Sequence, residues 1–210
     1  MTESALLSDD WPEFPPLDLT VRDLALSRGE VRLCEALELD LSSGDAVFLV
    51  GANGAGKTTL LRAIAGFVRP DAGEIDCGGH AEDTVSWLGH SDGLKPNETL
   101  RQALRFWCRQ SGQSSKAIMP VLKMLEIGHL IDRPAGRLSR GQQRRAGMAR
   151  VALANRPIWL LDEPAGPLDG DGRACLARLV AWHRGRGGMV VAATHQTLDW
   201  PSAKTLELGR

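Results

Sequence analysis

The chain has 210 residues, enough for one ordinary domain, and 43% of them are hydrophobic, which is sufficient for a packed core. Its formal net charge of -1 provides no basic field of the kind that attracts nucleic acid, so we expect no nucleic-acid partner. The four cysteines are scattered without a CxxC pair, and no apolar run reaches the about eighteen residues of a membrane span, so a cysteine-ligated zinc site and a spanning helix are not expected.

The N-terminal part of the chain alternates predicted strands and turns. Residues 1–16 are acidic and rich in proline, and we expect a flexible tail there. Alternating apolar and polar residues at 17–26 and 31–41 predict two strands around a turn. The solid apolar run 46–50 is typical of a buried parallel strand. A glycine-rich loop and a helix to about residue 67 follow it.

The middle of the chain changes from strands to helices. Short strands are expected near 74–77 and 84–88, and the pattern from about 91 to 147 is helical. We interpret residues 91–147 as a helical subdomain inserted into an α/β core. Four arginines gather at its end, and a solvated helix face is our favoured interpretation of them over a basic patch. They are Arg140, Arg144, Arg145 and Arg150.

The C-terminal part returns to alternating elements. Ser139 predicts the cap of a helix that runs toward Ala154. A buried strand at 158–164, a helix from about 172 to 184 and a strand at 189–194 follow, and a short tail completes the chain. This alternation predicts a mostly parallel sheet with helices on both faces, whose ligands lie at the carboxyl ends of the strands.

The loop between the strand at 46–50 and the next helix carries the strongest chemical signal. Its residues, GANGAGKT at 51–58, fit a phosphate-binding loop, in which glycines let backbone N–H groups surround an anion. Lys57 is expected to reach the β- and γ-phosphates of a nucleotide, and the Thr58 hydroxyl to bind Mg²⁺. The predicted contacts of the loop are Gly51, Ala52, Asn53, Gly54, Ala55, Gly56, Lys57, Thr58 and Thr59.

Three polar residues lie at the ends of two later strands and can converge on this loop. Asp162 is expected to hold Mg²⁺, through water, as the partner of Thr58. Glu163 can accept a proton from an attacking water, and a partly dry site would raise its pKa. His195 can donate to a γ-phosphate oxygen and orient Glu163. Alone, the acids suit a strand-end cap and the histidine a structural role, but the phosphate loop favours catalysis.

A second anion site is predicted at LSRGQ, residues 138–142. Ser139 lies at a helix N-terminus, and the N–H groups of Gly141 and Gln142 are expected to be exposed. The chain has a single nucleotide loop. A second phosphate site therefore predicts that ATP is held between two copies of the chain.

In this order and spacing, the motifs resemble the ATP-binding cassette of ABC transporters over about residues 17–208. The resemblance implies a P-loop NTPase fold at 17–210, with a mostly parallel core, an N-terminal antiparallel β region and the inserted helical subdomain. It implies a Walker A motif at 51–58, a signature at LSRGQ, a Walker B motif with the catalytic glutamate at LLDEP, and a switch histidine at His195. It also implies that two cassettes sandwich ATP and Mg²⁺, and that their motion is passed to integral membrane subunits.

A narrower resemblance is carried by WLGHSDGLKPNETL, LSRGQQRRAGMAR, WLLDEPAGPLD and GGMVVAATHQ. These strings are similar to the haem-exporter ATPase subunits of bacterial cytochrome c maturation, which implies haem export or delivery at the cytoplasmic face of the inner membrane. A cassette that exports a lipid, drug or peptide is the alternative, because no cassette residue contacts cargo. A soluble ABC-type mechanical ATPase is disfavoured, because the chain has one cassette and no sustained heptads.

Three positions depart from the pattern of the resembled family. Arg28 stands where an aromatic residue usually stacks on adenine; a guanidinium plane can stack on a base, and a plain surface arginine is equally open. His90 replaces a glutamine that touches Mg²⁺ and senses the membrane subunits; its imidazole can make a water-mediated contact or sense pH. Pro167 stands at a D-loop position where a small residue is usual.

Overall fold

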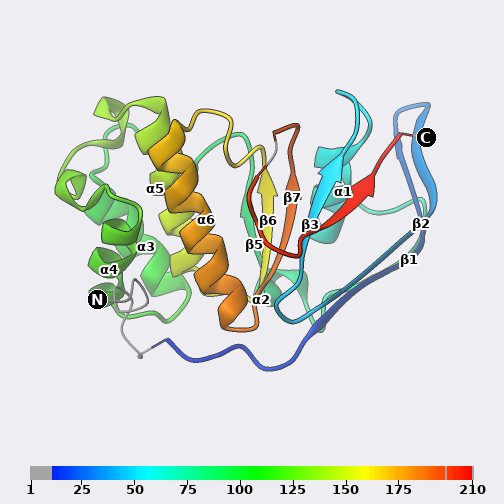
Figure 1. Cartoon of the computed structure of the whole chain (residues 1–210), viewed down its shortest axis with the longest axis horizontal. Coiled ribbons are helices and arrows are strands. Elements are labelled where there is room, and N and C mark those ends of the chain that lie inside the picture. Colours follow the sequence, from blue (N-terminus) through cyan, green and yellow to red (C-terminus); the bar gives the residue numbers. More distant parts are fainter. Residues whose placement is uncertain (1–10, 197, 210) are drawn as a thin grey trace.

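Two β-sheets organise the residues that the computed structural model describes, 11–196 and 198–209 (Figure 1). The larger sheet is parallel, in the order β5-β6-β7-β3-β8, and the smaller is antiparallel, in the order β2-β1-β4. The predicted parallel core and N-terminal antiparallel region are therefore confirmed. The strands are β1 (Asp18–Arg28), β2 (Val31–Ser42), β3 (Ala46–Val50), β4 (Ala72–Asp76), β5 (Val85–Leu88), β6 (Ile158–Asp162), β7 (Met189–Ala193) and β8 (Lys204–Glu207).

Helices cover the parallel sheet on both faces (Figure 1). The helices are α1 (Lys57–Ile64), α2 (Ala81–Thr84), α3 (Leu100–Gln110), α4 (Ile118–Met124), α5 (Arg140–Leu153) and α6 (Gly170–Gly185). Short 3-10 turns lie at Ser115–Ala117, Gly128–Leu130 and Ala135–Arg137. Within the described residues, no helix combines the length and the apolar character that crossing a bilayer requires.

The strand β6 lies between β5 and β7, and its first four residues are all apolar because both faces of the strand are covered. Trp159 and Leu161 enter a core shared with α3, α4, α5 and α6, whereas Ile158 and Leu160 enter a second core shared with α1 and the antiparallel sheet. Successive side chains of a strand point to opposite faces, so a strand covered on both faces needs apolar residues at every position. All five residues of β6 are buried.

Residues 11–16 differ from the expected flexible tail, whose residues 1–10 lie outside the described part of the chain. The ring of Trp11 meets that of Trp182 edge-on at 5.2 Å between centroids. The Arg186 guanidinium lies 5.1 Å from the Trp11 ring and 4.6 Å from that of Phe14, and the Phe14 N–H donates to the Arg186 carbonyl at 2.8 Å. The acidic, proline-rich composition hid these two rings, which anchor the segment on the end of α6.

Two other expectations are corrected by the structure. The segment expected as a short C-terminal tail contains β8, which pairs in parallel with β3. Its four residues are largely exposed, so they give no hydrophobic alternation that could reveal a strand. The expected solvated face of arginines is wrong for Arg144 and Arg150, whose exposed fractions are 3% and 9%. Burial lowers the pKa of Arg150 to about 10, and its guanidinium lies 4.8 Å from the Trp107 ring.

Candidate nucleotide site

The phosphate-binding loop connects the end of β3 to the start of α1, as the sequence predicts. Gly56 precedes α1 with φ of 101°, a left-handed conformation that favours glycine. Gly51 has φ of 142°, and a Cβ atom there would lie 2.4 Å from the Leu208 carbonyl oxygen. The loop therefore needs glycine at both ends. The loop reverses the direction of the chain, so the N-terminus of α1 faces the interior of the loop. The positive end of the helix dipole there stabilises a bound anion.

Lys57 lies over the loop with only 8% of its surface exposed. Its Nζ donates to the carbonyl oxygens of Gly51 at 2.6 Å and Ala52 at 3.0 Å, and the Ala55 N–H donates to the same Ala52 oxygen at 3.1 Å. The ammonium group is thus held at the mouth of the loop by main-chain oxygens. A bound phosphate would offer it a stronger, charged acceptor.

Thr58 and Asp162 are brought together although they are 104 residues apart. The Thr58 hydroxyl donates to Asp162 Oδ2 at 3.0 Å, and the Nδ1 atom of His90 lies 3.5 Å from the same oxygen. Asp162 is buried at 3% exposure, whereas the His90 side chain is 79% exposed. The site therefore offers two adjacent oxygen ligands, with an imidazole above them at the solvent side.

Glu163 follows Asp162 with its carboxylate directed at His195. The distance from His195 Nε2 to Glu163 Oε1 is 3.3 Å, and the Glu163 side chain is 19% exposed. Burial raises the pKa of the Glu163 carboxyl above its ordinary value, while the nearby His195 and Lys57 work in the opposite direction. The direction agrees with the expectation for a partly dry site. Such a shift suits a group that accepts a proton near neutral pH.

One cavity of about 370 Å³ gathers most of the predicted site residues. It is lined by Arg28, Asn53, Gly54, Gly56, Lys57, Thr58, Thr59, His90, Asp162, Glu163 and His195. Arg28 belongs to the end of β1 and reaches this cavity from the antiparallel sheet, so it is placed beside the loop rather than on a distant surface. Gly51, Ala52 and Ala55 form the backbone of the loop beneath the cavity.

The predicted second anion site is separate from this cavity. Ser139 caps α5 through a reciprocal pair of bonds with Gln142: Ser139 Oγ accepts from the Gln142 N–H at 3.2 Å, and Gln142 Oε1 accepts from the Ser139 N–H at 3.0 Å. The Gln142 N–H, which was expected to be exposed, lies at an exposed position and donates within this capping box. A Cβ atom on Gly141 would lie 3.1 Å from the Pro167 carbonyl, so the D-loop segment packs against the start of α5.

Sequence reasoning missed a buried arginine beneath the site. Arg144 donates to the main-chain carbonyls of Asp162 and Glu163, and to the Asp92 carboxylate. The sequence shows four arginines near one another, but four of the five acceptors of Arg144 are backbone oxygens, which carry no signature in the sequence. One signal could have indicated this role. Arg144 lies five residues after Ser139, on the helix that faces the end of β6.

Comparison with known proteins identifies the family. The family model for the ABC transporter matches residues 34–166. This chain belongs to the ABC transporter family. It is an ATP-binding cassette that hydrolyses ATP. The matched residues include the phosphate loop at 51–58, the LSRGQ segment at 138–142, and Asp162 and Glu163.

Curated relatives match the chain over nearly its whole length. A cytochrome c biogenesis ATP-binding export protein from Maricaulis maris is 60% identical over 205 residues, which cover 95% of this chain and 96% of the relative. A protein with the same name from Paracoccus denitrificans is 46% identical over 91% of this chain and 89% of the relative.

Solved structures share the fold. An ABC transporter ATP-binding protein from Pyrococcus furiosus superposes with a TM-score of 0.80 at 25% identity, covering 91% of this chain and 97% of that one. A dimeric bacterial ABC transporter cassette gives a TM-score of 0.75 at 23% identity, over 85% and 88% of the two chains. At that identity the second match supports the fold alone.

Proposed function

We propose that this chain is the ATP-hydrolysing subunit of an ABC export complex that acts in cytochrome c biogenesis. The observation that carries the proposal is the 60% identity, over 95% of the chain, to a relative named for that process. The motif strings of the sequence favour haem export or delivery as the driven step. A lipid, drug or peptide remains the alternative cargo, because the site described above binds the nucleotide and not the cargo.

Mg²⁺ fits the donor set of the cavity. Hard cations take oxygen ligands, and the Thr58 hydroxyl and the Asp162 carboxylate are brought together in the cavity; Thr58 would bind the ion directly and Asp162 through water. Among the described residues, no group of three or more His, Cys, Asp and Glu side chains forms a metal cage. This matches an ion completed by nucleotide phosphates and water, with His90 making a contact through water. The ion would supply positive charge to the phosphates.

The remaining site residues divide the work of hydrolysis. Lys57 leaves the loop carbonyls for the β- and γ-phosphates, and the loop N–H groups hold the phosphate oxygens. Glu163 takes a proton from the attacking water, and His195 holds the Glu163 carboxylate and donates to the γ-phosphate. Arg28 stacks its guanidinium on the adenine from its position on the cavity wall.

A second copy of the chain completes the site in our proposal. In the cap of α5, Ser139 Oγ accepts a bond, which leaves its proton to donate to a γ-phosphate oxygen of the nucleotide held by the other copy. The Gly141 N–H lies in the first turn of the same helix, where backbone donors lack helical partners. Two copies related by a twofold axis would then enclose two nucleotides.

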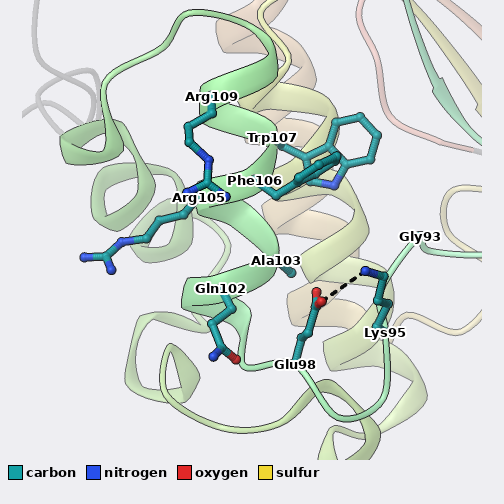
Figure 2. Close-up of a pocket in the computed structure, with 9 residues that line it drawn as sticks. All are labelled: Gly93, Lys95, Glu98, Gln102, Ala103, Arg105, Phe106, Trp107 and Arg109. Atoms are coloured by element: carbon teal, nitrogen blue, oxygen red, sulfur yellow. Dashed lines mark hydrogen bonds and ion pairs between the residues drawn. The ribbon is translucent and has the colours of Figure 1, made fainter.

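Integral membrane subunits are the other partners that we propose, with the chain at the cytoplasmic face of the bacterial inner membrane. A groove of about 520 Å³ lies along α3 and the segment before it (Figure 2). Phe106 is 45% exposed there, beside Trp107. Lys95, Arg105 and Arg109 outnumber the one carboxylate of Glu98, so the groove suits an acidic segment with an apolar anchor.

Glu163→Gln tests the catalytic assignment. The amide keeps the shape of the carboxyl but cannot accept the proton, so kcat for ATP hydrolysis should fall at least about 100-fold. ATP affinity should stay within about threefold, because the residues that grip the phosphates are intact. Steady-state hydrolysis and nucleotide titration measure the two quantities. Unchanged turnover would remove Glu163 from its role.

Lys57→Ala is the contrasting variant. It removes the cation that faces the phosphates, so ATP binding itself should weaken by at least about tenfold. A titration in which Lys57→Ala and Glu163→Gln bind ATP equally well would show that the loop does not grip the phosphates as proposed.

Affinity purification from membranes of the producing organism tests the export role. We expect the tagged chain to recover integral membrane subunits of cytochrome c biogenesis, and Phe106→Asp to reduce that recovery because it places a charge in the groove. Phe67→Asp is the matched control, since Phe67 is also exposed, at 67%, but lies outside the groove. Recovery of a lipid or drug permease would contradict the cytochrome c role, and equal loss from both variants would contradict the groove.

A further inference from the structure

Arg144 joins three segments of the chain beneath the nucleotide site. It lies in the first half of α5 with 3% of its surface exposed. Its guanidinium donates to three consecutive carbonyls at the end of β6: to Asp162, to Glu163 at 2.9 Å and to Pro164 at 3.3 Å. It also donates to the Gly89 carbonyl at 2.7 Å and to Asp92 Oδ1 at 2.9 Å.

The backbone that Arg144 grips is in an unusual conformation. Glu163 has φ of 48°, in the left-handed region that side chains other than glycine rarely adopt. Three bonds hold it there: its N–H donates to the Ala193 carbonyl at 2.9 Å, and its carbonyl accepts from Arg144 and, at 3.3 Å, from the Gly166 N–H. Such a conformation persists only where its surroundings enforce it. In this conformation the carboxylate faces the cavity and His195.

Asp92 fixes the guanidinium from the other side. It lies on the loop that follows β5, two residues after His90, and its side chain is 15% exposed. The loop approaches α5 at Gly147, where a Cβ atom would lie 3.0 Å from Asp92 Cβ. A buried cation needs a charged partner, and Asp92 is the carboxylate that forms an ion pair with Arg144. Through Asp92 and the Gly89 carbonyl, the loop therefore holds the guanidinium from one side, and the carbonyls of residues 162–164 hold it from the other.

We propose that Arg144 is a positioning residue for Glu163, and that Asp92 sets Arg144 for this task. This inference rests on the proposed role of Glu163 as the base. The planar guanidinium can donate hydrogen bonds to several carbonyls and one carboxylate at once. A lysine ammonium group has the same charge but cannot reach this set of acceptors. The link also joins the base to the two surfaces that we propose for partners: the helix that begins at Ser139, and the loop whose residues Gly93 and Lys95 line the groove.

Arg144→Lys in the full chain tests the proposal. Lysine keeps the positive charge but lacks the several N–H donors of the guanidinium group. We therefore expect kcat to fall at least about tenfold while KM for ATP stays within about twofold. Arg145→Lys is the matched control: it lies one residue further on the same helix but donates to the Leu125 carbonyl, away from Glu163. That control should keep kcat within about twofold. Turnover is divided by the amount of nucleotide bound. A smaller fraction of folded protein in a variant therefore does not change the ratio of its kcat to that of the natural chain.

The decisive comparison places Arg144→Lys in the Glu163→Gln background. If Arg144 acts through Glu163, the second change should alter the residual single-turnover rate by less than about twofold. A further tenfold loss in that background, or an Arg144→Lys chain with unchanged kcat, would overturn the proposal. If Glu163→Gln alone leaves turnover intact, the proposed base has failed, which is a separate result from the failure of Arg144.

Asp92→Asn provides a second variant should Arg144→Lys fail to fold. It keeps an oxygen acceptor in place but removes the charge, which weakens the hold on the guanidinium. We expect kcat to fall at least about threefold in the wild-type background and by less than about twofold in the Glu163→Gln background. Equal losses in both backgrounds, or no loss in either, would contradict the coupling.

Discussion

Burial shifts the proton affinity of single residues in opposite directions at two places in this chain. At the site, burial raises the pKa of the Glu163 carboxyl, which suits a base. In the core, burial lowers the pKa of the fully buried His183 to about 3. Its ring stacks on Trp159 at 3.8 Å between centroids, and its Nε2 lies 3.1 Å from the Pro157 carbonyl oxygen. His183 is therefore neutral in the folded protein.

His183 should make folding stability depend on pH. The pKa of His183 is about 6.5 in the unfolded chain and about 3 in the folded protein. Below neutral pH the unfolded chain therefore binds a proton at this residue that the folded protein does not bind. The contribution of His183 to the free energy of unfolding is fully present above about pH 7 and is lost as the pH falls. Protonation of this one group lowers the free energy of unfolding by about 2 kcal/mol between pH 8 and pH 5. Urea unfolding at the two pH values measures the loss.

His183→Phe is the control for this prediction, because phenylalanine can keep the stacking on Trp159 but cannot be protonated. Its loss of stability between pH 8 and pH 5 should be smaller than that of the natural chain by about 2 kcal/mol. An identical pH dependence in both proteins would show that His183 does not carry the effect.

The sequence predicts those residues whose chemistry demands a fixed residue type at a fixed spacing. The loop at Gly51–Thr58 and the acids after β6 are of this kind, and the structure places them around one cavity. Arg144 is of the other kind. Four of its five acceptors are carbonyls 18 to 55 residues away, and any residue can supply a carbonyl. Such a contact depends on the fold, and no local pattern encodes it.

At the scale of elements, capping residues mark helix starts well and short exposed strands leave little trace. Ser139 is the helix cap that the sequence predicts, and it forms a capping box with Gln142. Thr99 forms a second capping box, with Gln102, at the start of α3. The strand β8 was missed because its four residues show no burial pattern. Tertiary pairing with β3 makes it a strand, and this pairing lies beyond local propensity.

Thr99→Ala tests the cap of α3. It removes the side chain that accepts from the Gln102 N–H, so the free energy of unfolding should fall by about 1 kcal/mol. KM for ATP should not change, since Thr99 is outside the nucleotide cavity. Ser115→Ala, at an exposed position of the same helical region, should stay within about 0.5 kcal/mol. Equal destabilisation by both changes would mean that the cap contributes nothing specific.

At the scale of the whole molecule, the direction of the strands determines where the site lies. β3, β6 and β7 are parallel neighbours, so the loop after β3, the acids after β6 and His195 after β7 meet at one edge of the sheet (Figure 1). The alternating pattern of the sequence was sufficient to predict this edge. The signature helix α5 presents Ser139 outside the cavity that it is proposed to close, which is why we propose a second copy.

The mass of the Glu163→Gln chain in solution, measured with and without ATP and Mg²⁺, tests this central claim most directly. We predict a single chain of 22.7 kDa without nucleotide and a species of twice that mass with it, because hydrolysis no longer separates the copies. Adding Ser139→Glu, which places a negative charge against the γ-phosphate, should abolish the larger species. A chain that binds ATP tightly yet stays single, or that doubles equally well with Ser139→Glu, would contradict the account.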